Sequence, residues 1–494
     1  MIQTVVIAGR DAAAWLSANV LHQALGHTGL NIKVVELPSL VRRQDIYPTL
    51  PALEPLHRLL GFDEHTVLRA TAGAYAMGQS FVNFAGPGTA FFHAYGSHGV
   101  GLDNLPFLPL YLRARQAGLK VAIEDFSLTA AAAKQGRFIV PDTETQLFAR
   151  TDYGYHLPAD SYVQFLKQAA VRAGISVHSA ATLRGESNSA GHLTAVITGT
   201  GERVEGDLFI DATGTDALLL RKALRVPFDS WRPWFAADRV LAASGPRLKN
   251  LPPYGQIRAN ALGWLGLYAA QTSTHIVNVY DSRLQSDNDA LHGAAVVSGL
   301  VLGDAFVSPL EPGRAHQAWR GNCVAIGEAA CVFDPLDSPA LQAVQTGLVH
   351  LLSLFPNRLE GPESAVYNRL MQQTFEGIRD FQLSHSALGR LDGAFWHDAR
   401  AVAPPPSLQR KLDAFAARGL VPLDDEETFL GDSWEAVMLG HGLIPQSHEP
   451  LADAVPDADL MAHLKRVLGH IKSQVDEGHA HDAYLEIFGA PETV

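Results

Sequence analysis

The first 36 residues constrain the fold more than any other part of the chain. Ile2 to Ala8 is a short apolar run, and after Gly9 the residues Ala12 to Leu25 follow helical periodicity. A second apolar run, Ile32 to Val35, ends at Glu36. Strand, tight turn, helix and a strand that closes on an acid about 20 residues later form the outline of a dinucleotide-binding βαβ unit. We therefore expect an α/β fold.

The glycines of this turn depart from the usual dinucleotide fingerprint. Gly9, Asp11 and Ala14 stand where G-x-G-x-x-G/A places its small residues. The second glycine normally lets the backbone approach the pyrophosphate, so a carboxylate there adds both bulk and like charge. Arg10 is the neighbouring cation that would offset this charge. The sequence leaves the strength of nucleotide binding open.

Composition and charge exclude several classes of protein. The 494 residues are 47 % apolar and 18 % charged, which is typical of a folded enzyme. A net charge of −13 and the lack of a basic stripe argue against nucleic-acid binding. The apolar N-terminus has no positive region before it, and the longest apolar stretch, Ala294 to Val307, falls short of the ~20 residues of a membrane span. We expect a cytoplasmic protein without a membrane segment.

Cysteines and a histidine pair are the candidates for metal binding. The spacing of Cys323 and Cys331 fits no zinc signature, so we interpret them as inert buried thiols. His479, His481 and Asp482 could ligate a metal, but their charged C-terminal helix favours a solvated face. We expect no metal site.

Two further segments support a nucleotide site. The apolar strand Leu208 to Ile210 leads into Asp211 to Gly214, and the strand Cys323 to Ile326 leads into Gly327. A strand that ends in glycine and opens a helix brings backbone N–H groups toward phosphate or ring oxygens. Glu328 could face a flavin or cap the next helix, and both readings stay open. The candidate cofactor-binding residues are Gly9, Ala14, Glu36, Asp211, Gly214, Gly327, Asp334 and Pro335.

These segments also carry a family resemblance. The stretches 319–327, 333–338 and 207–214 resemble the flavin motifs of tryptophan halogenases. Similar agreement occurs at 153–157, at Asp238-Arg239, along 367–396 and at 440–445. The chain is identified as a member of the flavin-dependent tryptophan halogenase superfamily. The resemblance implies a Rossmann-like FAD-binding domain of the aromatic-hydroxylase/halogenase type, with a β-rich substrate region and a helical C-terminal part.

The resemblance also implies a division of the chain. Residues 1–355 form an FAD-binding module and residues 356–494 a helical C-terminal region. Within the module, segments 1–60, 140–225 and 315–355 bind the nucleotide. Insertions 61–139 and 226–314 lie on the substrate side.

Three positions depart from the halogenase pattern. The lysine that carries the oxidised halogen in this family maps to Ala76, and a methyl group cannot replace it. The two-tryptophan signature keeps Trp264 but has Gly266 in place of the second tryptophan. The halide-binding turn maps to Ser338-Pro339-Ala340, and Pro339 has no N–H to donate. Halogenation is therefore the least favoured activity.

The assisting glutamate of the family maps to Asp337, which remains a carboxylate and is our candidate acid/base. Trp264, Ser338, Phe395 and Trp396 are the expected substrate pocket. Trp231 and Trp234 either line this pocket or pack in the core.

The favoured function is a two-component FAD-dependent monooxygenase that acts on a small aromatic molecule. A separate flavin reductase would supply the reduced FAD, and a homodimer stays open. The alternative is a non-catalytic descendant that binds a small molecule or a protein, and Asp11 favours it.

Overall fold

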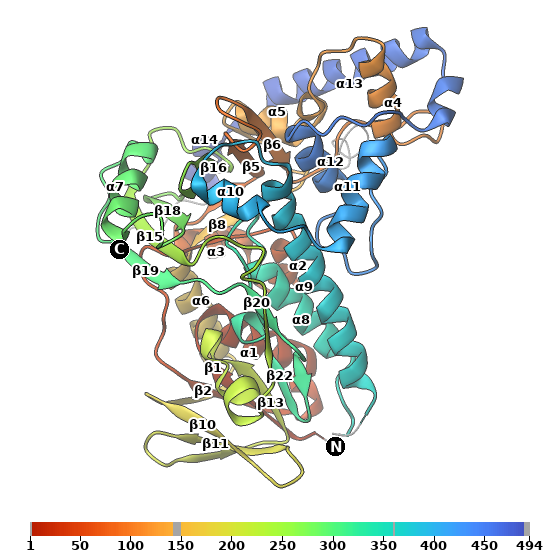
Figure 1. The fold of residues 1–494 in the computed structure, drawn as a ribbon. Helices are drawn as coiled ribbons and strands as arrows, with labels where there is room; N and C mark the ends of the chain where they lie inside the picture. The colour runs from red at the N-terminus through yellow and green to blue at the C-terminus, as the bar shows by residue number, and fades with distance from the viewer. Residues whose placement is uncertain (1, 142–149, 359–360, 489–494) are drawn as a thin grey trace.

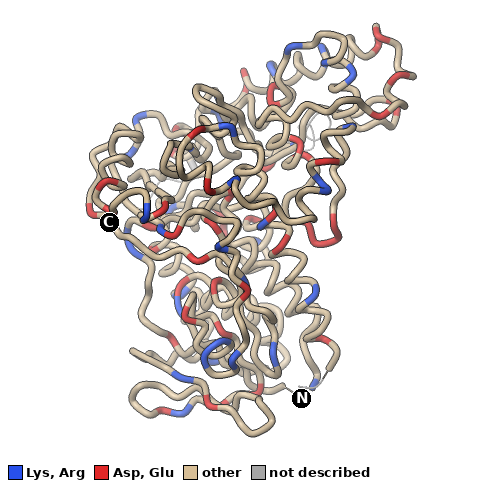
Figure 2. The backbone as a smooth tube through the Cα atoms, in the orientation of Figure 1, with Lys and Arg blue, Asp and Glu red and all other residues tan. Residues whose placement is uncertain are grey.

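A computed structural model describes residues 2–141, 150–358 and 361–488. Two β-sheets form its centre, and helices surround both (Figure 1). Figure 2 shows Lys and Arg interspersed with Asp and Glu over the backbone. In the described part of the chain, no helix combines the length and apolarity that crossing a bilayer requires.

The first sheet has six strands in the order β21-β22-β13-β1-β2-β9. All neighbours pair in parallel except β21 with β22. Its central strand β1 is fully buried from Val5 to Ala8, as the apolar run predicts. The bounds are β1 Thr4–Gly9, β2 Asn31–Glu36, β9 Ser176–Ser179, β13 Leu208–Ala212, β21 Trp319–Arg320 and β22 Cys323–Ala325. The predicted α/β fold is confirmed.

Helices pack on this sheet and against each other. Helix α1 (Asp11–Leu25) contacts α6 (Ala159–Arg172) and α8 (Ala340–Ser353). The α1 residues Ala14 and Trp15 are buried, and Asn19 Nδ2 donates to the Leu166 carbonyl at 2.9 Å. These contacts hold the start of α1 in place at the end of β1.

The second sheet has seven strands in the order β19-β15-β18-β17-β16-β5-β6. Its pairs are antiparallel except for β16 with β5, which are parallel. Helix α7 (Asp287–Ser298) packs on it over a small separate core that includes Leu241, Ile276 and Ala290. The bounds are β5 Gly78–Val82, β6 Ala90–Ala94, β15 Arg239–Pro246, β16 Gly255–Asn260, β17 Gly263–Ala269, β18 Ser273–Tyr280 and β19 Phe306–Pro309.

The described residues also form four small sheets and several short helices. The small sheets are β10-β11-β12, β14-β20-β23, β3-β8-β4 and β24-β7. Their strands are β3 Ile46–Pro48, β4 Ala74–Ala76, β7 Arg137–Phe138, β8 Gly154–Pro158, β10 Leu183–Ser187, β11 Leu193–Thr198, β12 Arg203–Glu205, β14 Phe228–Ser230, β20 Gly313–Ala315, β23 Cys331–Val332 and β24 His479–Ala480. The helices are α2 Leu53–Leu59, α3 Glu64–Thr71, α4 Phe107–Gln116 and α5 Leu128–Lys134.

Helices predominate from Ala340 onward. They are α9 Glu363–Leu388, α10 Ala394–Arg400, α11 Pro406–Arg418, α12 Gly431–Gly440, α13 Asp457–Glu477 and α14 His481–Phe488. Figure 1 shows α11, α12 and α13 at the end of the molecule opposite the β10–β11 hairpin.

The predicted solvated face at the C-terminus is wrong for one residue. The His481 side chain is buried, and its Nδ1 lies 3.0 Å from the Leu251 carbonyl. Asp482 forms an ion pair with Arg247. Cys323 and Cys331 are free and buried, as predicted.

Candidate active site

Three turns meet beyond the carboxyl ends of the parallel strands. Gly9 ends β1, and a Cβ added there would lie 2.3 Å from the Ala212 carbonyl oxygen. Gly214 follows β13 with φ +77°, and Gly327 follows β22 with φ +70°. A Cβ on Gly327 would lie 2.9 Å from that of Ala13 in α1. The backbones of these turns thus approach closely, which fits the cradle of a dinucleotide.

Asp11 keeps the backbone conformation of the glycine it replaces. Its φ is +58°, in the left-handed region that asparagine, aspartate and glycine adopt most readily. Its carboxylate accepts hydrogen bonds from the Ser39 hydroxyl at 2.5 Å and from the Leu40 N–H at 3.2 Å. Burial raises the pKa of this carboxyl. The side chain therefore bonds to the loop after β2, while its charge stays at the turn.

Further acids gather beside Asp11. Desolvation of the Glu328 carboxyl group, together with the charges of Asp11 and Asp45, raises its pKa. Desolvation and the same acids raise the pKa of Tyr47. Arg10 does not bond to Asp11; its Nη2 lies 3.5 Å from Asp216. The backbone therefore fits a flavin dinucleotide, whereas the acids oppose its pyrophosphate.

Two predicted cofactor ligands have other partners. Both oxygens of Glu36 accept from Lys167 Nζ, at 2.6 and 2.8 Å. Asp211 is fully buried and accepts from the backbone N–H groups of Thr213, Leu219 and Leu220 and from the Thr213 hydroxyl. Asp211 thus holds the turn that contains Gly214, and any contribution to cofactor binding is indirect.

The segment from Asp334 to Ser338 forms a buried turn. The Leu336 N–H donates to Asp334 Oδ1 at 2.9 Å, and Gln382 Nε2 in α9 donates to the carbonyls of both residues. Asp337 and Ser338 adopt φ of +62° and +59°. Burial raises the pKa of Asp334 to about 7. Two consecutive left-handed residues are strained, and such strain gathers at functional sites.

Asp337 faces His385, a histidine for which the sequence predicts no role. His385 Nε2 in α9 lies 3.3 Å from Asp337 Oδ2, and His385 Nδ1 lies 3.2 Å from His441 Nε2. All three side chains are buried, and neither Asp337 oxygen has a hydrogen-bond partner among the described residues. Desolvation lowers the pKa of His441. The arrangement is a buried acid linked to two imidazoles, which can hold or move a proton.

Ala76 ends β4 and is 1 % exposed. It pairs with Gly154, where an added Cβ would meet the Thr49 carbonyl at 2.2 Å. Gln79, on β5, is the side chain of this segment that reaches the turn, and its Nε2 donates to Ser338 Oγ at 3.0 Å. The described turn thus receives a neutral amide from this part of the chain.

Aromatic side chains enclose the space next to Asp334 and His385. Trp264 contacts Asp334, and Trp396 donates through Nε1 to the Asn260 carbonyl at 2.6 Å. The cavity holds about 40 Å³, far less than the several hundred Å³ of usual ligand sites. Its lining comprises Phe84, Trp234, Phe235, Ala236, Ala237, Trp264, Asp334, Leu336, Gln382, His385, Ser386, Phe395, Trp396 and Ala399. The predicted pocket residues Trp264, Phe395 and Trp396 therefore lie together. Ser338 is not part of this lining but belongs to the same turn as Asp334 and Leu336.

Of the two alternatives for Trp231 and Trp234, lining the pocket or packing in the core, each holds for one of them. Trp234 lines the aromatic cavity, whereas Trp231 is 3 % exposed and packs near Phe333 with ring centroids 6.3 Å apart. The Arg379 guanidinium lies over both indoles, at 5.4 and 5.1 Å from the ring centroids.

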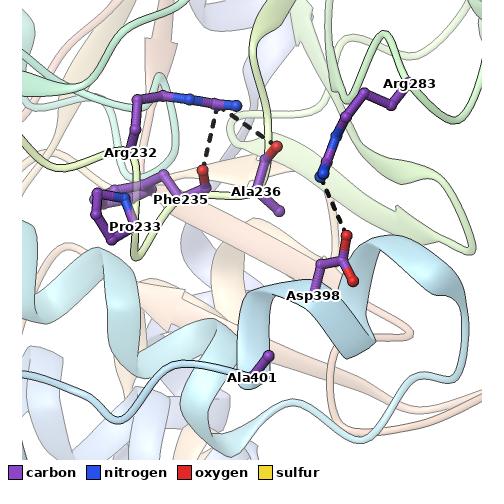
Figure 3. Close-up of a pocket in the computed structure, with 7 residues that line it drawn as sticks. All are labelled: Arg232, Pro233, Phe235, Ala236, Arg283, Asp398 and Ala401. Atoms are coloured by element: carbon purple, nitrogen blue, oxygen red, sulfur yellow. Dashed lines mark hydrogen bonds and ion pairs between the residues drawn. The ribbon is translucent and has the colours of Figure 1, made fainter.

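A larger open recess of about 450 Å³ adjoins this cavity (Figure 3). The two share Phe235 and Ala236, so one short segment separates them. Arg232 binds the carbonyls of this segment, and Arg283 pairs with Asp398 at 3.1 Å across the recess. The recess is thus an approach from solvent toward the aromatic cavity.

Known proteins resemble the whole chain. The family model for tryptophan halogenases matches residues 4–457. A tryptophan 6-halogenase, ThaL, from Streptomyces albogriseolus is 26 % identical over 94 % of each chain. Among solved structures, the flavin-dependent halogenase Xcc4156 from Xanthomonas campestris has a TM-score of 0.94 and 29 % identity over 100 % of each chain. The flavin-dependent halogenase BrvH from Brevundimonas sp. BAL3 has a TM-score of 0.93 and 31 % identity over 98 % of this chain and 99 % of its own.

Proposed function

Because this chain belongs to the tryptophan halogenase family, we propose that it is a flavin-dependent monooxygenase of a small aromatic molecule and no longer halogenates. Proteins of this family use FAD, with the reduced form supplied by a separate flavin reductase. The observation that carries the proposal is the buried Asp337–His385 pair beside an aromatic cavity, in a chain with alanine at position 76.

The backbone turns at Gly9, Gly214 and Gly327 would hold the dinucleotide. When bound, reduced FAD supplies the two electrons that activate molecular oxygen. In a monooxygenation, one oxygen atom enters the aromatic ring and the other leaves as water. Asp337 and His385 would accept or return the proton that the substrate exchanges.

The aromatic cavity supports a flat apolar substrate. Trp264, Trp396 and Phe395 can stack on or edge against a ring and exclude water from it. Because the cavity holds about 40 Å³, the substrate must displace side chains to enter. The segment that contains Phe235 and Ala236, next to the open recess, is the candidate to move.

Several observations oppose halogenation. Ala76 carries no amine. In the turn that maps to the halide site, the Ser338 N–H already donates to the Pro335 carbonyl at 3.3 Å, and Pro339 has no N–H. A non-catalytic binding protein is the second candidate, and the acids around Asp11 together with the small cavity favour it.

The first test is flavin binding. The purified protein is titrated with FAD and with reduced FAD while the absorbance between about 350 and 500 nm is recorded. No binding of either form would refute the enzyme proposal and leave the binding protein. Binding of reduced FAD is the expected result.

The second test adds a flavin reductase, oxygen and a panel of indoles and phenols. We expect products heavier by one oxygen atom, with the label of ¹⁸O₂, and no such product from Asp337→Asn. Brominated products in the presence of bromide would instead establish a halogenase.

A further inference from the structure

A second cluster of ionisable side chains lies where the loop after β6 meets α12. His98 belongs to this loop, Asp432 lies in the first turn of α12, and Glu435 follows three residues later in the same helix. One ligand atom from each residue lies within 4.8 Å of the other two. Residues three apart on a helix project to the same side, so both carboxylates can face one point.

The His98 side chain has an unusual environment. It is 3 % exposed, and neither ring nitrogen has a hydrogen-bond partner among the described residues. Its Nδ1 lies 3.5 Å from Asp432 Oδ1, which is longer than a normal N–H···O hydrogen bond. Buried polar groups without partners are rare, because each one costs about 1–3 kcal/mol.

The charges of the cluster are unbalanced as well. Two carboxylates face a single imidazole. Asp432 also accepts from the backbone N–H of His98 at 3.1 Å. Arg150 lies near enough to act on Asp432, but its guanidinium lies 3.5 Å from Asp152. A cation between the three side chains would supply both the missing positive charge and the missing partner of the His98 ring.

We propose that His98, Asp432 and Glu435 bind one divalent transition-metal ion, with Zn²⁺ as the best fit. Imidazole nitrogen with carboxylate oxygens suits Zn²⁺ and its neighbours, whereas Mg²⁺ and Ca²⁺ prefer oxygen ligands alone. In a tetrahedral site with ~2.1 Å between the ion and each ligand atom, two ligand atoms lie about 3.4 Å apart. This is close to the 3.5 Å between His98 Nδ1 and Asp432 Oδ1. A small inward movement of Glu435 completes the set, and water takes the fourth position.

Such an ion would have a structural role. The loop of His98 continues from β6 at one edge of the seven-stranded sheet, and α12 packs on β6. The ion would tie this sheet edge to the C-terminal helices.

The test uses the full-length protein, freed of metal by a chelator and of flavin by dialysis. Co²⁺ is titrated and followed by its visible absorption, and Zn²⁺ is titrated by calorimetry. We expect one ion per chain and displacement of Co²⁺ by Zn²⁺. His98→Asn and Glu435→Gln should each weaken Zn²⁺ binding ~100-fold or more, since each removes a ligand.

The matched control is His350→Gln. His350 Nε2 also contacts a carboxylate, that of Glu426 at 3.0 Å, but it belongs to no such cluster among the described residues. This variant should bind Zn²⁺ like the parent protein. If His98→Asn does not fold, as judged by circular dichroism, Glu435→Gln decides alone.

Absence of stoichiometric Zn²⁺ and Co²⁺ binding to the parent protein would overturn the proposal. Binding that survives Glu435→Gln unchanged would overturn it too, because the ion would then lie elsewhere. A Zn²⁺-dependent rise in Tm in the parent and the His350→Gln control but not in Glu435→Gln would support it.

Discussion

The contact between Asp337 and His385 makes a quantitative prediction about folding stability. Both side chains are about 1 % exposed, and Oδ2 of Asp337 lies 3.3 Å from Nε2 of His385. With both groups ionised and an effective dielectric constant of ~20, their attraction is about 5 kcal/mol. Desolvation removes several kcal/mol per ion, so the pair as a whole is close to neutral for stability.

Removing the histidine should therefore cost much more stability than removing the carboxylate charge. His385→Phe keeps the ring that stacks on Phe81, with centroids 4.5 Å apart, but leaves the Asp337 carboxylate buried without a counterion. We expect a loss of about 3–5 kcal/mol in the free energy of unfolding. Asp337→Asn removes the charge and tolerates φ +62°, so we expect a change within about 1 kcal/mol.

The assay is urea unfolding of the parent, the two single variants and the double variant at one pH. The double-mutant cycle should give a coupling free energy of at least about 2 kcal/mol, because Asp337→Asn rescues His385→Phe. Additive effects of the two substitutions would refute the reasoning. So would an Asp337→Asn variant that loses as much stability as His385→Phe.

Four further predictions concern other parts of the chain. Asp11→Gly should tighten FAD binding about tenfold or more in an absorbance titration, because it keeps the left-handed turn and removes the charge; unchanged affinity would count against this. Ala76→Lys should yield no halogenated indole by mass spectrometry, since Pro339 still lacks an N–H; any such product would contradict us. Lys411→Met leaves Glu427, which is buried beside it, without its cation and should cost about 3 kcal/mol or more in urea unfolding; a loss below about 1 kcal/mol would disprove this. Lowering the pH from about 6.5 to 4 should reduce Tm steadily, because the unfolded chain binds protons that four buried histidines with pKa values of about 4 do not bind in the folded protein. The free energy of unfolding should fall by ~1 kcal/mol per histidine per pH unit. A flat profile would exclude a role for His57, His93, His156 and His481.

Local patterns were sufficient to predict the first strands and helix of the six-stranded sheet. The apolar run before Gly9 is β1, the helical pattern after it is α1, and Glu36 ends β2, because each signal depends on neighbouring residues. The seven-stranded sheet could not be predicted in the same way. It pairs β5 with β16 in parallel, and no local pattern specifies a partner so far along the chain.

The candidate site could likewise be predicted only in part. A motif located Asp337, but His385 lies in α9 and His441 directly follows α12. Only packing brings the His385 ring to the carboxylate and the His441 ring to His385. The solvated face predicted for His481 is wrong, because the charged residues around it in the sequence do not indicate that its imidazole turns inward. The role of Glu36 stays a prediction, and its ion pair with Lys167 was not foreseen because it depends on how α6 packs.

The strand order of the first sheet has a consequence for synthesis on the ribosome. Strand β1 lies between β2 and β13, and β13 in turn lies between β1 and β22, whose last residue is Ala325. A nascent chain therefore presents an unpaired apolar strand edge until most of its length has emerged. At ~5–20 residues per second, this exposure lasts on the order of tens of seconds. Chaperone capture during translation should thus matter more for this protein than for one whose sheet neighbours follow each other in sequence.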